Sequence, residues 1–325
     1  MNISRIAMIV AAAVVTMPAP AQAQGQAQDW PNRPVHVILP YAAGGSTDVA
    51  ARFVGEFLSR SLGQQFVIEN RTGANGNVAM DAAAKSAPDG YTIMITTEAL
   101  VSNPHVYKVT FDPLKDFVPV IQLSRQPVVI AVHPSLGVNT LGELVTVVKR
   151  DPGMGYGTGS GFGSGQSIVM QWFARIAGIK VDQVAYRGGG QAINDLIAGH
   201  VKIGSLGSTP LMPHYRTGAL KLLAQSTAAR SSSLPDVPTF AEAGIAGLVF
   251  DQWVGVFVPP GTPAAIIARL NAELNKALQE PAIRANLLKA AQDPVGGSAE
   301  PFAELVRHDF GTFGKLVKEL EIKVN

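Results

Sequence analysis

The sequence predicts an α/β protein of two lobes, built on mostly parallel sheets. Segments with strand propensity alternate with segments of helical periodicity along almost the whole chain, as expected for this class. The chain has 325 residues, 47% of them hydrophobic and only 15% charged, so it exceeds the usual size of one domain and can bury a large core. No long linker divides the chain. We therefore expect two chain crossings, near residues 125 and 250, to join the lobes through strands.

The first 23 residues are typical of a secretory signal peptide. Arg5 provides a positive charge, an apolar run extends from Ile6 to Met17, and Ala21-Gln22-Ala23 fits a cleavage site. The run is shorter than the about 20 residues that a membrane span requires. The chain has no cysteine, so we expect export without disulfides or a lipid anchor, to the periplasm of a Gram-negative bacterium.

A small-residue loop between the first strand and the first helix is the strongest candidate for a binding site. The strand is expected at Val35–Leu39, and the loop Pro40–Asp48 leads into a segment whose apolar residues recur at helical spacing. Ser46 or Thr47 can cap that helix, whose unpaired N–H groups and dipole attract anions. The loop has no Lys or Arg, so a carboxylate fits better than a polyphosphate. The alternative is a tight turn that binds nothing.

The same strand–loop–helix pattern continues along the chain. Further strands are expected at Gln65–Glu69, Tyr91–Thr97, Phe117–Leu123, Val128–Val132, Gly155–Thr158, Val181–Tyr186, Val201–Leu206, Leu220–Gln225 and Phe250–Val258. Further helices are expected at about 78–87, 141–150, 191–198, 281–290 and 301–323, with one that follows Ser167 and ends at Ala177 and one that begins at about Pro263. We expect a break between strands near Pro127, and helix caps at Thr140 and Thr262.

Composition and motifs argue against several classes of function. The net charge is +2 and no basic cluster contains interleaved aromatic residues, so nucleic-acid binding has little support. The chain lacks cysteine and its six histidines are scattered, so we expect no metal and no cofactor. The glycine-rich segment 155–165 does not satisfy G-x-G-x-x-G, since Phe162 and Ser164 stand where the third glycine would fall. No nucleophile with a neighbouring base can be identified, which favours binding over catalysis.

Taken together, the loops resemble those of the Bug-type solute receptors, the substrate-binding proteins of tripartite tricarboxylate transporters. The resemblance covers essentially the whole chain after residue 23. It is carried by Trp30–Val35, Pro40–Arg52, Glu69–Asn77, Ala87–Thr92, Lys115–Phe117, Tyr186–Gly189, Leu234–Thr239, Glu242–Gly244 and Pro259–Pro263. The sequence departs from the family at two positions, since many relatives carry a histidine at the position of Ser167 and a glycine at the position of Asn75.

The resemblance implies a periplasmic Venus-flytrap protein that is not an enzyme. Residues 1–23 would be the signal peptide, residues 24–125 with 250–325 one lobe, and residues 126–249 the other. The protein would hold a small aliphatic or aromatic mono- or dicarboxylate between its lobes and deliver it, as a monomer, to inner-membrane transporter subunits. Two alternatives stay open, a receptor for a membrane signalling partner and a periplasmic hydrolase or lyase.

The resemblance also implies which residues touch the ligand. The expected ligand-binding residues are Ala43, Gly44, Gly45, Ser46, Thr47, Asp48 and Thr97 in the first lobe, Ser160, Ser164, Gly165, Gln166, Tyr186, Arg187, Gly188, Ser205 and Ser208 in the second, and Asp251 where the chain returns. Arg187 is expected either to pair with a ligand carboxylate or to be solvated ahead of a helix. Trp253 is expected either beside Asp251 in the cleft or in the core.

Overall fold

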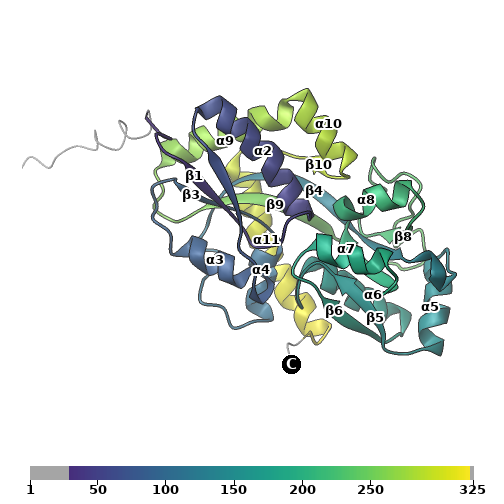
Figure 1. Cartoon of the computed structure of the whole chain (residues 1–325). Coiled ribbons are helices and arrows are strands. Elements are labelled where there is room, and N and C mark those ends of the chain that lie inside the picture. The colour runs from purple at the N-terminus through teal and green to yellow at the C-terminus, as the bar shows by residue number, and fades with distance from the viewer. Residues whose placement is uncertain (1–28, 323–325) are drawn as a thin grey trace, which may run out of the picture.

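The computed structural model describes residues 29–322, so the expected signal peptide lies outside the described residues. Within them the chain alternates between strands and helices, as predicted (Figure 1). The strands are β1 Val35–Leu39, β2 Phe66–Asn70, β3 Thr92–Thr97, β4 Val118–Val132, β5 Met154–Thr158, β6 Val181–Ala185, β7 Ile203–Gly207, β8 Lys221–Gln225, β9 Asp251–Val258 and β10 Asp293–Pro294.

The helices occupy most of the segments expected from periodicity. The α-helices are α2 Ser46–Leu62, α3 Asn77–Ala84, α4 Ala99–Ser102, α5 Leu141–Arg150, α6 Gly165–Ala177, α7 Gly189–Ile197, α8 Ser208–Arg216, α9 Ala264–Gln279, α10 Pro281–Lys289 and α11 Ala299–Glu319. Short 3-10 turns lie at Ala74–Gly76, Asn103–His105 and Pro134–Leu136.

The strands follow the order β2-β1-β3-β9-β4-β7-β5-β6, with β8 and β10 also pairing with β4. The outer strands are parallel, since β1 pairs in parallel with β2 and β3, and β5 with β6 and β7. The two long strands β4 and β9 run antiparallel to each other and to their remaining neighbours. The expectation of parallel sheets therefore holds for the two outer parts, and β4 and β9 connect them.

The prediction of two strands separated near Pro127 is wrong, because β4 is one continuous strand of 15 residues. It pairs with β9 up to Pro127 and with β7 from Val128 onward. Proline has no N–H to donate to a ladder, and here it stands where β4 changes partners, a position at which a strand tolerates it. Beside it, Arg125 pairs with Trp253 and Gln126 with Gln252, so β4 and β9 lie side by side at the two expected crossings.

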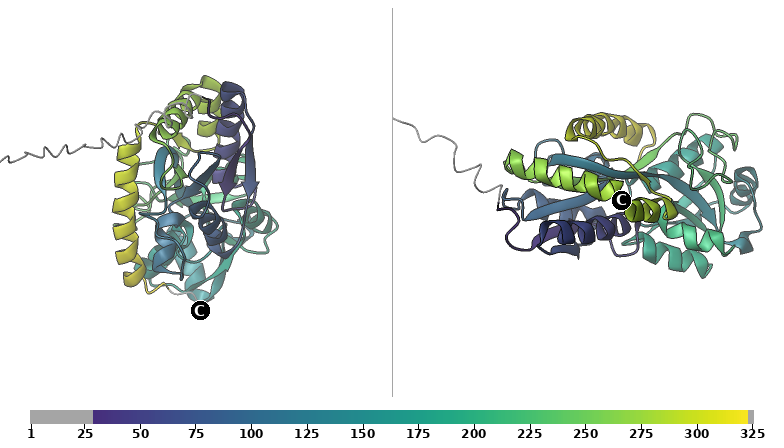
Figure 2. Two further views of the ribbon diagram at one scale, coloured as in Figure 1. Left: turned by 90° about the vertical axis from the view of Figure 1, so that its left-hand side faces the viewer. Right: turned by 90° about the horizontal axis from the view of Figure 1, so that it is seen from above.

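The hydrophobic core continues through this junction. One cluster contains buried residues from both outer parts of the fold, among them Met94 on β3, Phe173 on α6 and Trp253 on β9. The helix α11 lies along one side of the molecule and spans much of its length (Figure 2). It packs closely on β9, because a Cβ at Gly255 would lie 2.1 Å from the ring of Phe302. This helix therefore braces the crossing strands from one side.

Two of the three expected helix caps differ from the prediction. Thr140 does cap α5, where its Oγ1 accepts the Glu143 N–H at 3.2 Å. Thr262 does not cap α9, because its hydroxyl donates to the Pro259 carbonyl at 2.8 Å. The third expected cap lies in the binding loop and is described with the site.

Candidate functional site

The first part of the site is the N-terminus of α2, which the loop after β1 presents to the interior. The N-cap is Gly45, not Ser46 or Thr47, and no side chain caps the helix. The Ser46 hydroxyl instead donates to Gln126 Oε1 at 3.0 Å. The first bond within the helix runs from the Val49 N–H to the Gly45 carbonyl. The N–H groups of the first helical residues therefore have no partner within the helix and can bind an anion.

A second helix N-terminus, that of α7, faces the first across a narrow gap. A Cβ at Gly45 would lie 3.7 Å from Gly189 N, and one at Gly188 would lie 2.7 Å from the Cβ of Ala42. The Ala42 N–H donates to the Arg187 carbonyl at 3.1 Å, which joins the two loops directly. The approach at Gly188 requires glycine, because a Cβ there would push the two loops apart, whereas a Cβ at Gly45 would make an ordinary contact. Two positive helix ends thus converge on one space.

This space is a cavity of about 30 Å³, which we call the central cavity. It is lined by Tyr41, Ala42, Gly45, Ser46, Thr47, Asp48, Thr97, Gly159, Ser160, Gln166, Gly189, Pro210 and Gln252. No Lys or Arg is among these lining residues. The groups available to an anion are therefore backbone N–H groups, hydroxyls and side-chain amides.

Asp48 is the charged residue of the lining, and its charge is balanced locally. Its carboxylate accepts two bonds of 2.9 Å from Arg52, one of 3.1 Å from the Gly44 N–H and one of 3.1 Å from Asn70. Burial acts to raise the pKa of Asp48, but these hydrogen bonds outweigh it and hold the pKa below its usual value. Gly44 supplies its N–H from a left-handed conformation with φ +88°. Asp48 therefore shapes the loop and adds no free acid to the cavity.

A buried chain of polar side chains connects the cavity to the crossing strands. Gln126 Nε2 donates to Gln252 Oε1 at 2.8 Å, and Gln252 Nε2 donates to Glu98 Oε1 at 3.0 Å. The same Glu98 oxygen accepts the Gly165 N–H of α6 at 3.1 Å. Burial is the main cause that raises the pKa of Glu98 to about 7, and its second oxygen, Oε2, has no hydrogen-bond partner. Glu98 thus joins the end of β3 to the N-terminus of α6.

A second hollow of about 420 Å³ adjoins the central cavity and shares Tyr41 and Ser160 with it. Tyr186 and Arg187 line this outer hollow, with the loop 72–76 opposite. The Tyr186 hydroxyl donates to Asp195 at 2.6 Å, and burial, with Asp195, raises the pKa of Tyr186 to about 12. The hydroxyl of Tyr186 is therefore already engaged, whereas the Arg187 side chain is exposed at the mouth of the hollow.

The structure brings about half of the expected site residues to these two spaces. The expected residues that line the central cavity or the outer hollow are Gly45, Ser46, Thr47, Asp48, Thr97, Ser160, Gln166, Tyr186 and Arg187. Others support them from behind, since Ser164 caps α6, Ser205 Oγ donates to the Gln166 carbonyl and Ser208 Oγ donates to the Ala291 carbonyl. Ala43, Gly44, Gly165 and Gly188 shape the loops through their backbone and are not among the lining residues.

The placement of Asp251 in the cleft is corrected by the structure. Asp251 and Trp253 lie on the opposite side of β9, where they line a separate groove, and Trp253 is also part of the core. Gln252, between them, lines the central cavity. Successive side chains of a strand point to opposite faces, so only one of each neighbouring pair could reach the ligand.

The sequence reasoning missed six of the residues that line the central cavity. They are Tyr41, Ala42, Gly159, Gly189, Pro210 and Gln252. Four of them stand next to an expected residue, so a margin of one position along each loop would have included them. Tyr41 is half-buried, and its hydroxyl lies 3.3 Å from Thr97 Oγ1. Burial and the neighbouring Glu98 raise the pKa of Tyr41, so this hydroxyl keeps its proton.

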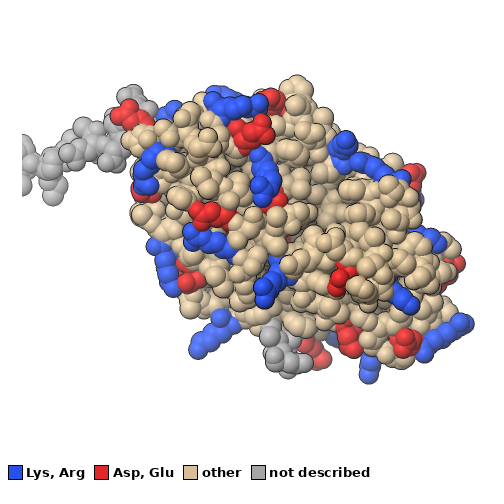
Figure 3. Space-filling view, in the orientation of Figure 1, with Lys and Arg blue, Asp and Glu red and all other residues tan. Residues whose placement is uncertain are grey.

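Other binding chemistries find no support in the described part of the chain. Residues 29–322 contain no group of three or more His, Cys, Asp or Glu side chains that could hold a metal ion. Charged side chains are scattered over the face shown in Figure 3, and Lys and Arg form no continuous patch there. No helix among these residues has both the length and the apolar character needed to cross a bilayer.

Comparisons with known proteins agree on the kind of molecule. Residues 50–322 match the family model described as "Tripartite tricarboxylate transporter family receptor". Protein BugT of Bordetella pertussis is 32% identical over 327 residues, and the alignment covers 100% of both chains. The structure of R. palustris Rpa4515 with adipate superposes with a TM-score of 0.88 at 33% identity, covering 91% of this chain and 100% of the other. The structure of MatC (Rpa3494) from Rhodopseudomonas palustris with bound malate superposes with a TM-score of 0.83 at 30% identity, covering 89% of this chain and 100% of the other.

Proposed function

This chain belongs to the tripartite tricarboxylate transporter family of receptors, and from this premise we propose that it captures a small organic carboxylate and delivers it to transporter subunits in the inner membrane. The proteins of this family are solute-binding proteins, not enzymes. We also propose that the mature protein is a periplasmic monomer released from its signal peptide at about residue 23.

The facing helix ends of α2 and α7 carry this proposal. A carboxylate placed between them would accept charge-assisted hydrogen bonds from backbone N–H groups, and each helix dipole would add to its binding energy. No lysine or arginine lines the central cavity, so the site would recognise the carboxylate group through geometry and not through an ion pair. The hydroxyl of Tyr41 and the amides of Gln166 and Gln252 would then bind the remaining polar atoms of the ligand.

The ligands named for two similar structures support a carboxylate. Rpa4515 is described with adipate and MatC with malate, and both ligands are aliphatic dicarboxylates. Both proteins resemble this chain over at least 89% of its length. We therefore propose a small aliphatic mono- or dicarboxylate as the first class to test, with aromatic acids as the second.

Ligand binding would require the two lobes to separate and close again. The lobes we propose are residues 24–125 with 250–325, and residues 126–249, with a hinge where β4 and β9 lie side by side. The central cavity measures about 30 Å³. A water molecule needs about 10–15 Å³ of such space, so the cavity has room for a few water molecules, and a carboxylate with a carbon chain needs more room than this closed arrangement offers. Small-angle scattering with and without ligand tests this movement, and identical curves at saturating ligand would contradict it.

Thermal denaturation of the mature protein against a panel of organic acids tests the function itself. The panel should contain mono- and dicarboxylates of increasing length, aromatic acids, and the corresponding amides as uncharged controls. An acid at 100 times its dissociation constant should stabilise the fold by about 2.7 kcal/mol, whereas its amide should have little effect. Failure of every acid in the panel to raise the melting temperature would contradict the proposal.

A further inference from the structure

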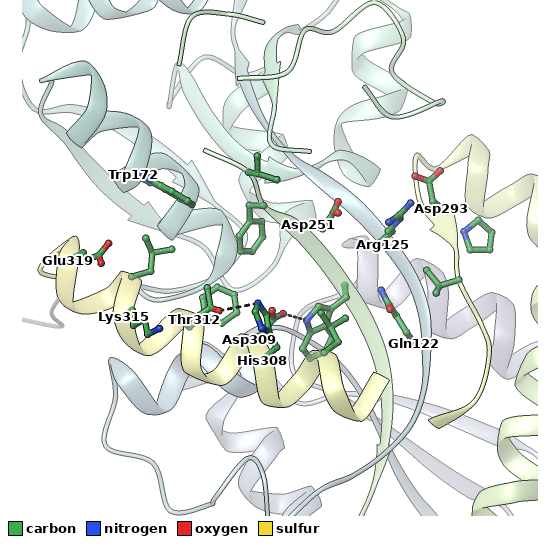
Figure 4. A pocket seen from close by; sticks show the side chains of 18 residues that line it. Gln122, Arg125, Trp172, Asp251, Asp293, His308, Asp309, Thr312, Lys315 and Glu319 are labelled. Carbon is green, nitrogen blue, oxygen red and sulfur yellow. Dashed lines mark hydrogen bonds between the residues drawn. The ribbon is translucent and has the colours of Figure 1, made fainter. Parts of the chain in front are cut away.

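A wide groove lies on the side of the crossing strands opposite the central cavity, and nothing in the proposed function uses it. Its volume is about 940 Å³ (Figure 4). One wall is α11, from Leu305 to Glu319, and the facing surface comes from α6, β4, β9 and the segment Asp293–Val295. We call it the rear groove. It runs along the place where the chain passes twice between the proposed lobes.

The rear groove combines an apolar floor with exposed apolar residues at its rim. Trp172, Phe250 and Leu316 are among its lining residues. At its edge Val249 is 50% exposed and Val295 is 45% exposed, two of the few large apolar side chains at the surface of the described chain. Apolar surface that is contiguous with a groove and rimmed by polar groups is typical of an interaction site.

The charges of the rear groove favour a basic partner. Four carboxylates line it, on Asp251, Asp293, Asp309 and Glu319, against the two cations of Arg125 and Lys315 and the imidazole of His308. Figure 4 shows Asp251 between Trp172 on one side and the pair Arg125 and Asp293 on the other. Asp309 accepts a hydrogen bond of 2.9 Å from Trp253 Nε1. Among the described residues, none of these four carboxylates forms a side-chain ion pair with a lysine or arginine.

The two central carboxylates are held where a cation would stabilise them. Surrounding protein is the main cause that raises the pKa of Asp251, even though its side chain remains accessible from the groove; Arg125 lowers this pKa and Asp293 raises it. Burial also raises the pKa of Asp309, against the hydrogen bond from Trp253 and the nearby His308, and Asp251 raises it further. The surroundings of each acid therefore disfavour its charged form, and an incoming ammonium or guanidinium group would stabilise that form.

We propose that the rear groove docks a basic and apolar segment of the membrane partner, with a lysine or arginine of that segment meeting Asp251 and Asp309. The identity of the partner as a membrane protein rests on the proposed function, whereas the shape and charge of the groove are independent of it. The α11 wall spans 14 residue steps, which is about 21 Å at about 1.5 Å per residue, enough for about six residues of extended chain. The apolar side chains of the segment would pack on Trp172 and the rim valines.

Docking here would distinguish the closed receptor from the open one. Trp172 lies on α6, in one proposed lobe, and α11 belongs to the other. A hydrogen bond of 2.5 Å from Arg175 Nη1 of α6 to the Glu319 carbonyl joins the two helices. Rotation about the paired strands that opens the central cavity would narrow a groove on their opposite side. A segment that fits the wide groove would therefore bind the closed form better, and by linkage the carboxylate would strengthen docking.

The test uses two synthetic hexapeptides as probes, both acetylated and amidated, one alternating Leu with Arg and the other alternating Leu with Glu. Binding to the mature protein is followed by isothermal titration calorimetry. We expect the Leu-Arg peptide to bind at least about tenfold more tightly than the Leu-Glu peptide. Asp251→Lys should remove this preference, whereas Asp236→Lys, an equal change of charge at an exposed site outside the groove, should leave it intact.

Equal binding of the two peptides, no binding of either, or an unchanged preference in Asp251→Lys would overturn the docking site. Because these titrations contain no small organic acid of the kind proposed as the ligand, they stand apart from the test of the proposed function. A repeat in the presence of the acid that most stabilises the protein should tighten Leu-Arg binding severalfold. An unchanged affinity there would overturn the preference for the closed form.

Discussion

The buried carboxyl of Glu98 makes the stability of this protein depend on pH in a way that one substitution can remove. Glu98 is fully buried, and Oε1 accepts bonds from both Gly165 and Gln252. Glu98→Gln keeps an acceptor for these two donors and has no charge. Its amide nitrogen takes the place of Oε2, which has no hydrogen-bond partner in the wild type. The variant should therefore fold and differ from the wild type mainly in its response to pH.

The sign and size of the effect follow from the raised pKa. Burial raises the pKa of Glu98 from 4.5 to about 7 in the folded protein. Between these two values the unfolded chain loses the proton and the folded chain keeps it, so the stability contributed by Glu98 is fully present below pH 4.5 and is lost as pH rises through about 7. A difference of about 2.5 pH units corresponds to about 3 kcal/mol of unfolding free energy.

Urea denaturation of both proteins between about pH 5 and pH 8 measures this effect. Relative to the wild type, Glu98→Gln should gain stability as the pH rises, by an amount approaching 3 kcal/mol, or roughly 6 °C in melting temperature. Glu304→Gln, a matched change at an exposed position of α11, should show no such trend. If the difference between Glu98→Gln and the wild type is constant over this range, the reasoning about the buried carboxyl is refuted.

Three further predictions concern the helix ends that form the central cavity. Gly45→Val should fold but lose at least about tenfold in affinity for the stabilising acid, because its side chain would fill the gap between α2 and α7; unchanged affinity by calorimetry would place the ligand elsewhere. Arg52→Ala leaves the buried Asp48 carboxylate without its cation, so it should lower stability by about 1 kcal/mol and weaken carboxylate binding, whereas Arg60→Ala on the same helix should do neither. Gly159→Ala should lower the unfolding free energy by about 1–3 kcal/mol, because its Cβ would lie 2.6 Å from the backbone of α7. A melting temperature equal to that of the wild type would contradict this, because it would mean that the loop moves aside at no cost in stability.

The fold was predictable from sequence because its signals are local. Strand propensity, helical periodicity and small-residue loops gave nearly every element to within a few positions, as for β1 and α5, whose bounds match the prediction. Pro127 was misread because its effect depends on the neighbouring strand. A proline ends pairing where a partner needs its N–H, and here β4 passes from one partner to another at that residue.

The binding loop was predictable for the same reason, and the rest of the site was not. The glycines and hydroxyl residues around Gly45 follow a strand and precede a helix, which is enough to predict free N–H groups. Whether Asp251 or Gln252 faces the cavity depends on the register of β9 within the sheet, and a shift of one residue exchanges them. The burial of Glu98 arises from contacts with residues 67 and 154 positions away, which no local pattern records.

Amide NMR spectroscopy of the mature protein tests the central claim most directly, that backbone N–H groups at two facing helix ends hold a carboxylate. The ligand is the acid that most stabilises the protein, and the spectra are transverse-relaxation-optimised. We expect the largest ligand-induced shifts at the N–H groups of Ser46, Thr47, Gly189 and Gly190, with the Trp253 indole N–H of the rear groove changing less. Shifts concentrated in the rear groove, with the four amides of α2 and α7 unaffected, would contradict the account.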